Sequence, residues 1–410
     1  MVLALSLVLA QPAAPATRAD MAERTLRMER TWRQVQDPAR RRAAVDVLSR
    51  AVGAFFANQT GQVCQLLDQA EAALRNETVS PSAGWRVRVV PPVVAPGEPY
   101  QLVYSWAYGS GDPAPPAPKA GVAPDREGDI TLDGPETLGR ALTLSVVRDF
   151  ESRRAALEQG DTLALARALT QIREGQYEWN APAHAWLVSG ERGRAEGWKN
   201  HEELPLVQAE NTVFRAWIPK EATAKTPVVI ALHGAGGSEN MFYEGYGAGL
   251  ARELAQKREW IFMTPRSSPT APTNCLKWLQ EARGLAPETV FIMGHSAGGG
   301  ATVSSLARLT APPNGIVLFA PATGAALPPA AQGVPTFLAV GEQEMGALKT
   351  VSERLGALLK DRSDSKFMMV PNSEHLLIVA DALEVWYYFM DKRLAEFLCS
   401  CLYVLVHHDG

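Results

Sequence analysis

The chain has 410 residues, of which 46% are hydrophobic and 20% are charged, and its formal net charge at pH 7 is -4. This length and composition suit two or three globular domains and exclude disorder of the whole chain. The slightly acidic balance lacks the basic field that attracts phosphate backbones, so nucleic acid is not an expected partner.

The first 20 residues have the pattern of a secretory leader. An apolar run from Val2 to Ala10 is followed by small residues that offer an Ala-x-Ala type of cleavage site, although no Lys or Arg precedes the run. We therefore predict a signal peptide over residues 1–20 and a secreted or periplasmic protein. No later stretch reaches the roughly 18 apolar residues of a membrane helix, so no membrane span is expected.

Residues 21–200 are predicted to form an accessory region that contains both helices and strands. An aspartate followed by proline, and then apolar residues three and four apart, predict a helical hairpin over about residues 37–74. Alternating β-branched and aromatic residues predict strands over 84–108. The proline-rich run over 111–124 predicts a linker or surface loop, and residues 138–172 return to a helical pattern. This region contains no group of residues that we interpret as catalytic.

Residues 205–395 alternate between strand and helix patterns, which is typical of a mostly parallel sheet with helices on both faces. The predicted strands cover residues 211–219, 226–234, 260–265, 289–294, 315–320, 334–341 and 366–370. Helices are predicted over 239–257, 276–283, directly after Ser296, 347–360 and 377–392. A sheet of this kind binds ligands at the carboxyl ends of its strands. Residues 396–410 are interpreted as a C-terminal tail.

A candidate nucleophile lies in the stretch Gly294-His295-Ser296-Ala297-Gly298, between a predicted strand and a predicted helix. In this setting Gly-x-Ser-x-Gly forms a strained turn that lifts the serine hydroxyl above the sheet. The pattern therefore predicts Ser296 as the nucleophile of an acyl transfer.

A serine hydroxyl needs a base and an orienting acid. His375 follows the last predicted strand and precedes the last helix, so it is the predicted base. The acid is expected just after the strand over 334–341, where Glu344 lies three residues past Gly341 and Glu342 is the alternative.

The oxyanion that forms in acyl transfer needs preorganised N–H donors. One is expected from Ala297, directly after the serine, and the other from the glycine-rich loop over 233–240. Within that loop Ala235 is the preferred donor, and Gly236 is the second choice. No metal or organic cofactor is expected, since the four cysteines match no metal-ligand spacing: Cys64, Cys275, Cys399 and Cys401.

These segments resemble the α/β-hydrolase family, within it the serine esterases related to polyhydroxybutyrate depolymerases, feruloyl esterases and dienelactone-hydrolase-like proteins. The likeness covers about residues 211–392 and is carried by VVIALHGAGGSENMF, GHSAGGG, LAVGEQE and SEHLLIVADAL. It implies an α/β-hydrolase fold and hydrolysis of a small-molecule or polymer ester through an acyl-enzyme. An aspartate would be more usual near Glu344. No oligomeric state is predicted.

Two alternatives remain: a serine peptidase of the same fold, and a non-catalytic binding protein whose hydrolase domain has decayed. The sequence between Ser296 and Glu344 is only long enough for a helix, a strand and a short loop, so it leaves no room for an inserted lid domain. It predicts an open cleft whose walls include the loops over 265–275 and 320–324.

Overall fold

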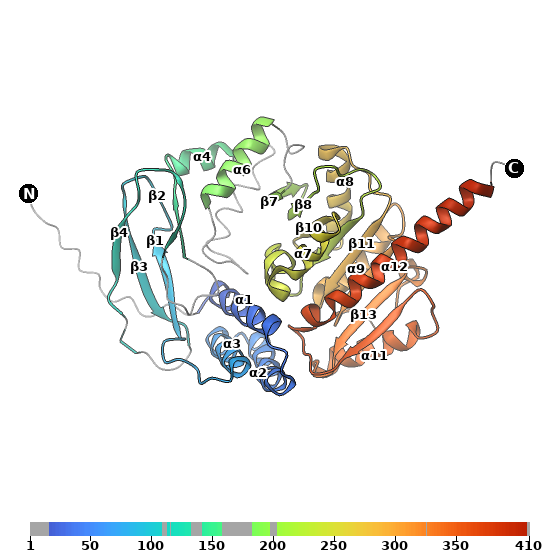
Figure 1. The fold of residues 1–410 in the computed structure, drawn as a ribbon, viewed down its shortest axis with the longest axis horizontal. Coiled ribbons are helices and arrows are strands. Elements are labelled where there is room, and N and C mark those ends of the chain that lie inside the picture. Colours follow the sequence, from blue (N-terminus) through green and yellow to red (C-terminus); the bar gives the residue numbers. More distant parts are fainter. Residues whose placement is uncertain are drawn as a thin grey trace, which may run out of the picture.

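The computed structural model describes residues 16–108, 113–114, 116–132, 142–157, 183–196, 203–324 and 326–407. These residues form three parts that lie side by side in Figure 1. A helical unit lies at the bottom of the view, a small β unit lies on the left, and a large α/β unit lies on the right.

The helical unit contains α1 (Arg18–Gln34), α2 (Pro38–Phe56) and α3 (Thr60–Arg75). The predicted hairpin is present as α2 and α3, and α1 is an additional helix whose start lies in the predicted leader. At that start, the side chain of Thr17 accepts a hydrogen bond from the Asp20 N–H, and the Asp20 carboxylate accepts one from the Thr17 N–H. Asp20 is fully buried and pairs with Arg86 at 2.9 Å. The folded unit therefore includes residues 17–20 of the predicted leader.

The β unit contains two three-stranded sheets with a shared apolar core. One sheet contains β1 (Trp85–Val90), β3 (Pro99–Trp106) and β4 (Lys119–Val122), and the other contains β2 (Val93–Val94), β6 (Leu142–Val146) and β5 (Gly128–Leu132). Beside them lie α4 (Phe150–Leu157) and α6 (Ala183–Glu196). The prediction of helix over 138–172 is wrong at β6, which pairs with β5 and β2 in a sheet, and residues 158–172 lie outside the described residues.

The α/β unit is built on an eight-stranded sheet in the order β14-β13-β12-β11-β9-β10-β8-β7. Its strands are β7 (Glu203–Ala209), β8 (Thr212–Trp217), β9 (Val228–Leu232), β10 (Ile261–Pro265), β11 (Val290–His295), β12 (Gly315–Phe319), β13 (Thr336–Gly341) and β14 (Lys366–Val370). The six strands from β14 to β10 are parallel, and β8 pairs antiparallel with both of its neighbours. This architecture, with helices on both faces, is the predicted α/β-hydrolase fold.

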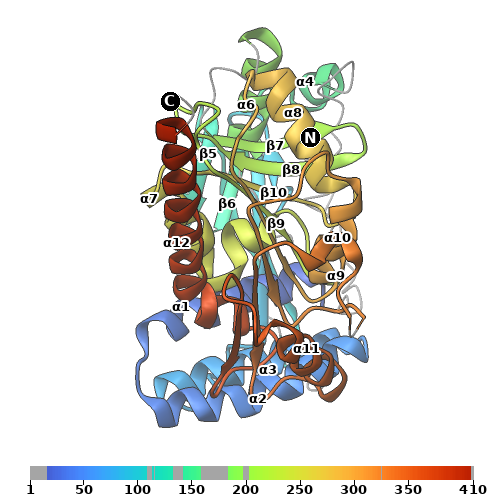
Figure 2. The same cartoon turned by 90° about the vertical axis from the view of Figure 1, so that its right-hand side faces the viewer.

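Two layers of helices bury the sheet. On one face lie α7 (Leu250–Lys257) and α12 (Ile378–His407), and on the other lie α8 (Ala271–Arg283), α9 (Ala297–Ser305) and α11 (Gly346–Leu359). Figure 2 shows these two layers on opposite sides of the strands. Within the described residues, no helix is long and apolar enough to cross a membrane.

Two predicted helix boundaries differ from the structure. The helix expected over 239–257 is broken into a π-helical turn (Met241–Gly245), a 3-10 turn (Tyr246–Gly249) and α7, because Gly247 and Ala248 have positive φ. The last helix continues past the predicted domain end at residue 395 and includes much of the predicted tail.

Candidate active site

The turn between β11 and α9 holds Ser296 in a strained conformation. Its φ of 53° and ψ of -119° are rare for a residue with a side chain. Its N–H donates to the Phe319 carbonyl at 2.9 Å, and its own carbonyl accepts from the Ala322 N–H at 2.8 Å. Close packing also requires Gly298, where a Cβ would lie 2.0 Å from the Leu232 carbonyl oxygen. Neighbouring strands thus fix the serine at the carboxyl edge of the sheet.

His375 and Glu344 come together at the same edge. The Nδ1 atom of His375 lies 2.9 and 3.0 Å from the two carboxylate oxygens of Glu344, and both side chains are buried. Glu344 also accepts a hydrogen bond from the Met345 N–H at 2.8 Å. The alternative acid, Glu342, is exposed and accepts from the Asn372 N–H instead. Of the two predicted acids, Glu344 is therefore the one placed to hold the imidazole.

The predicted oxyanion donors lie on both sides of the serine. Ala297 is the first residue of α9, so its N–H has no acceptor within the helix. The loop over 233–240 passes close by, since a Cβ on Gly234 would lie 3.3 Å from the Cβ of Ser296. Ala235 and Gly236 both line the cavity beside the serine. The arrangement leaves the choice between these two loop residues open.

The loop over 265–275, predicted as a cleft wall, makes hydrogen bonds to the glycine-rich loop over 233–240. Ser267 donates through its N–H to Nε2 of His233 at 3.1 Å, and through its hydroxyl to the His233 carbonyl at 2.7 Å. His233 Nδ1 donates in turn to the Gly234 carbonyl at 2.8 Å. Burial lowers the pKa of His233, which agrees with a neutral ring that accepts at Nε2.

A hydrogen-bonded chain through His295 links the glycine-rich loop over 233–240 to the backbone of His375. The Nε2 atom of His295 donates to the His375 carbonyl at 2.9 Å. Burial, followed by the nearby His375, lowers the pKa of His295 well below its usual value, so its ring is neutral and Nδ1 is an acceptor. The Tyr246 hydroxyl donates to this Nδ1 at 2.7 Å and accepts from the Gly234 N–H at 3.5 Å. Sequence reasoning missed Tyr246, for which no local motif exists.

Glu374, beside the predicted base, was also missed. It is buried, and its carboxylate accepts hydrogen bonds from the N–H groups of Leu376 and Leu377, just before α12. Burial raises its pKa to about 7. An acid shortly before a predicted helix is a recognisable capping signal, but its burial depends on tertiary packing.

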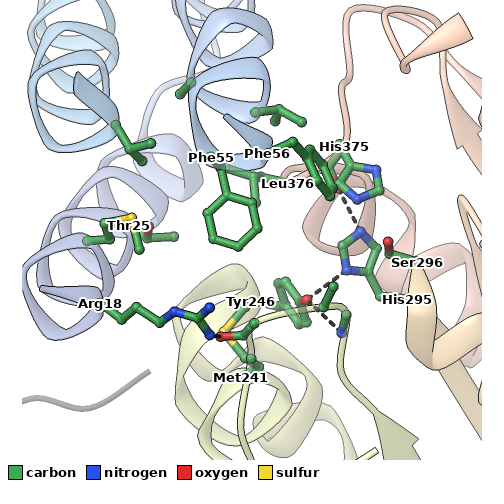
Figure 3. Close-up of a pocket in the computed structure, with 18 of the residues that line it drawn as sticks. Arg18, Thr25, Phe55, Phe56, Met241, Tyr246, His295, Ser296, His375 and Leu376 are labelled. Atoms are coloured by element: carbon green, nitrogen blue, oxygen red, sulfur yellow. Dashed lines mark hydrogen bonds between the residues drawn. The ribbon is translucent and has the colours of Figure 1, made fainter. Parts of the chain in front are cut away.

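A cavity of about 90 Å³ adjoins Ser296, His295 and His375. Figure 3 shows Phe55 and Arg18 on the side of this cavity opposite Ser296. Its far walls come from α1, α2 and α3, and residues 265–275 and 320–324 are not among the described residues that line it. The prediction that those two loops form walls of the cleft is not met at this cavity, where the helical unit supplies the far walls instead.

Comparisons with solved structures find proteins of similar fold. Est1E from Butyrivibrio proteoclasticus matches with 13% sequence identity and a TM-score of 0.38, over 48% of this chain and all of that one. A thermostable esterase matches with 15% identity and a TM-score of 0.37, over 44% of this chain and 58% of its own. The fluorophosphonate-binding serine hydrolase FphF from Staphylococcus aureus matches with 13% identity and a TM-score of 0.35, over 45% of this chain and 92% of that one. No protein-family model and no curated protein matches the sequence.

Proposed function

We propose that the protein is a serine hydrolase that cleaves carboxylic esters through an acyl-enzyme. Ser296 is the nucleophile, His375 is the general base, and Glu344 orients the imidazole. The observation that carries the proposal is the buried contact between His375 Nδ1 and the Glu344 carboxylate, at the sheet edge that holds the strained serine.

In the first proposed half-reaction, the Ser296 hydroxyl oxygen attacks the ester carbonyl carbon while His375 Nε2 takes the hydroxyl proton. The carbonyl oxygen becomes an oxyanion, which accepts hydrogen bonds from the Ala297 N–H and from Ala235 or Gly236. When the C–O bond breaks, the imidazolium returns the proton to the departing alkoxide, and an alcohol leaves. Water then repeats these steps on the acyl-serine and releases the carboxylic acid.

The buried carboxylate has two tasks in this scheme. By accepting from Nδ1–H, it keeps Nε2 free of a proton and able to take one from the serine. It also stabilises the imidazolium that forms in both half-reactions, and this charge effect is strong because both side chains are buried. No metal or organic cofactor takes part in the proposed steps.

A fluorophosphonate probe tests the nucleophile. The probe should label the wild type and should not label Ser296→Ala. Ser304→Ala is a matched control, because Ser304 is an exposed serine on the same helix, α9, and this variant should label like the wild type. Equal labelling of the wild type and Ser296→Ala, or no labelling of either, rejects the proposed nucleophile. Aryl esters assayed beside peptide amides then separate an esterase from a peptidase.

We further propose that the protein is exported and that its leader ends before Thr17. This proposal is supported by the leader pattern and by the role of Thr17 and Asp20 at the start of α1. Cleavage after Asp20 would remove both capping residues and with them the buried carboxylate that pairs with Arg86. N-terminal sequencing of the exported protein should find a start at or before Thr17, and a start at Met21 would contradict this boundary.

A further inference from the structure

The cavity beside Ser296 has an apolar wall that the helical unit supplies and the α/β unit does not. We propose that α1, α2 and α3 form the specificity pocket of the enzyme and that this pocket takes a compact, uncharged, apolar group of the ester. This inference rests on the proposed function and names the substrate class of the same site. The group belongs either to the acyl part or to the alcohol part, because the chemistry of the wall suits both.

The lining supports an apolar occupant. Met21 from α1, Val52 from α2, and Val63 and Leu67 from α3 all line the cavity, and all four are buried. Apolar surface of this kind binds apolar groups, and it penalises a charge that finds no partner there.

The dimensions of the cavity favour a compact occupant. Its volume of about 90 Å³ corresponds to about six to nine water-sized groups. A single ring or a chain of about four to eight carbons therefore fills it. A second hollow shares part of this lining, including Phe55 and Phe56, and also reaches the polar side chains of Asn58 and Thr60. Longer chains would meet these polar side chains and gain less from each added methylene.

Arg18 is the only Arg, Lys, Asp or Glu among the described residues that line this cavity. Its guanidinium is directed to the Gly236 carbonyl, to which Nη1 donates at 3.2 Å. Figure 3 shows this side chain at the edge of the cavity, away from Ser296. The contact ties α1 to the glycine-rich loop over 233–240, and the lining near the serine stays uncharged.

Buried polar contacts hold α1 of the helical unit on the α/β unit. The Trp32 indole N–H donates to Asp381 of α12 at 2.8 Å, and Glu29 accepts from the Gly247 N–H at 2.6 Å. These bonds cross from α1 to segments more than 200 residues later in the chain. A wall held in this way is preorganised, so it can select substrates by shape.

Phe55 is the residue best placed to set the length of the pocket. Its ring packs on the glycine-rich loop over 233–240, where a Cβ on Gly236 would lie 2.7 Å from the Phe55 Cζ. It lines both the cavity beside Ser296 and the second hollow. Removing this ring should join the two spaces. Filling the cavity beside Ser296 from Val52, one helical turn earlier on α2, should shorten the pocket.

Two substrate series measure this selectivity as kcat/KM. One series has straight-chain acyl groups on a common aryl alcohol, and the other has straight-chain alcohols on a common acetyl group. In one of the two series, kcat/KM should rise by up to about fourfold per methylene and peak at about four to eight carbons. Phe55→Ala should move the peak to longer chains, and Val52→Phe should move it to shorter ones. Val122→Phe is the matched control, since Val122 is 68% exposed on β4, and its profile should equal that of the wild type.

Labelling of Ser296 by a small fluorophosphonate is measured on the same samples and separates the two levels of the proposal. If Ser296 is labelled but both series are flat, or the profiles of Phe55→Ala and Val52→Phe equal the wild-type profile, the pocket inference is overturned and the proposed function stands. A preference for a substrate with a terminal carboxylate over its uncharged analogue would also overturn the inference. Absence of labelling in the wild type would overturn the proposed function itself.

Discussion

Replacing Glu344 by glutamine gives the most informative test of the proposed triad. The carboxylate accepts from His375 Nδ1 at 2.9 and 3.0 Å and from the Met345 N–H at 2.8 Å. Glutamine has nearly the same shape, so the fold should persist, but it has no charge, and its NH2 group can face the imidazole. That group would favour a proton on Nε2, and the histidine could then no longer accept the serine proton.

The size of the loss follows from these two effects. Losing a charged hydrogen bond to the imidazolium costs about 1.5–3 kcal/mol, which lowers kcat by about tenfold to 150-fold. If the imidazole also takes the wrong tautomer, the total loss approaches about 10⁴, as for an aspartate-to-asparagine change in other serine triads. We therefore expect kcat of Glu344→Gln on an aryl ester to fall by a factor between about 10 and 10⁴.

Glu342→Gln is the matched control for this experiment. Glu342 is exposed and accepts from the Asn372 N–H, so its neutral analogue should keep kcat within about threefold of the wild type. Thermal unfolding of both variants identifies any loss that comes from folding. A Glu344→Gln enzyme with kcat within about tenfold of the wild type would refute the assignment. A severe loss in Glu342→Gln alone would move the acid to that residue.

Three further predictions concern the groups around the triad. Gly298→Ala should lower the free energy of unfolding, measured in urea, by about 1–3 kcal/mol, because its Cβ would lie 2.0 Å from the Leu232 carbonyl oxygen at the end of β9. Gly324→Ala is the control and should leave this free energy unchanged, because a Cβ there meets no atom within 4 Å. Tyr246→Phe should cost about 1–3 kcal/mol in the same assay, since Nδ1 of His295 loses its donor while buried, and unchanged stability would contradict the hydrogen-bonded chain. Burial raises the pKa of Glu374 from 4.5 to about 7. The protonated carboxyl therefore contributes fully to the free energy of unfolding below about pH 4.5, and this contribution is lost as the pH rises through 7. Glu374→Gln stays neutral at every pH, so the free energy of unfolding of the wild type should fall by about 3 kcal/mol relative to this variant between pH 4.5 and pH 7. The same difference between the two proteins at both pH values would disprove this prediction.

The sheet, and the edge of it at which the proposed catalytic residues lie, could be predicted because the signals are local. Strands such as β9 and β13 are continuous apolar runs, as expected when both faces are covered. The positions of the proposed catalytic residues follow from chain order, since Ser296, Glu344 and His375 each lie just after a strand. Parallel strands bring these positions to one edge, so the sequence predicts that they meet there before any distance is known.

Other features were missed for identifiable physical reasons. At β6 the apolar Leu142, Leu144 and Val146 alternate with polar residues, but this five-residue strand pattern is short and lies within a longer stretch of helical composition. The break before α7 depends on positive φ at Gly247 and Ala248, and an alanine gives no warning of such a conformation. The cavity lining depends on contacts such as Arg18 to Gly236, 218 residues apart, which no local pattern encodes.

No domain is inserted between Ser296 and Glu344, yet α1, α2 and α3 line the cavity beside Ser296. A cover that comes from the N-terminal part of the chain leaves the strand order of the α/β unit unchanged. Leu377, two residues after the proposed base, is fully buried in the core that α1, α2 and α3 share. Trp32 of α1 is part of the same core and also donates to Asp381. The helices that line the cavity therefore also hold the loop of His375, so changes in this core should affect turnover as well as substrate preference.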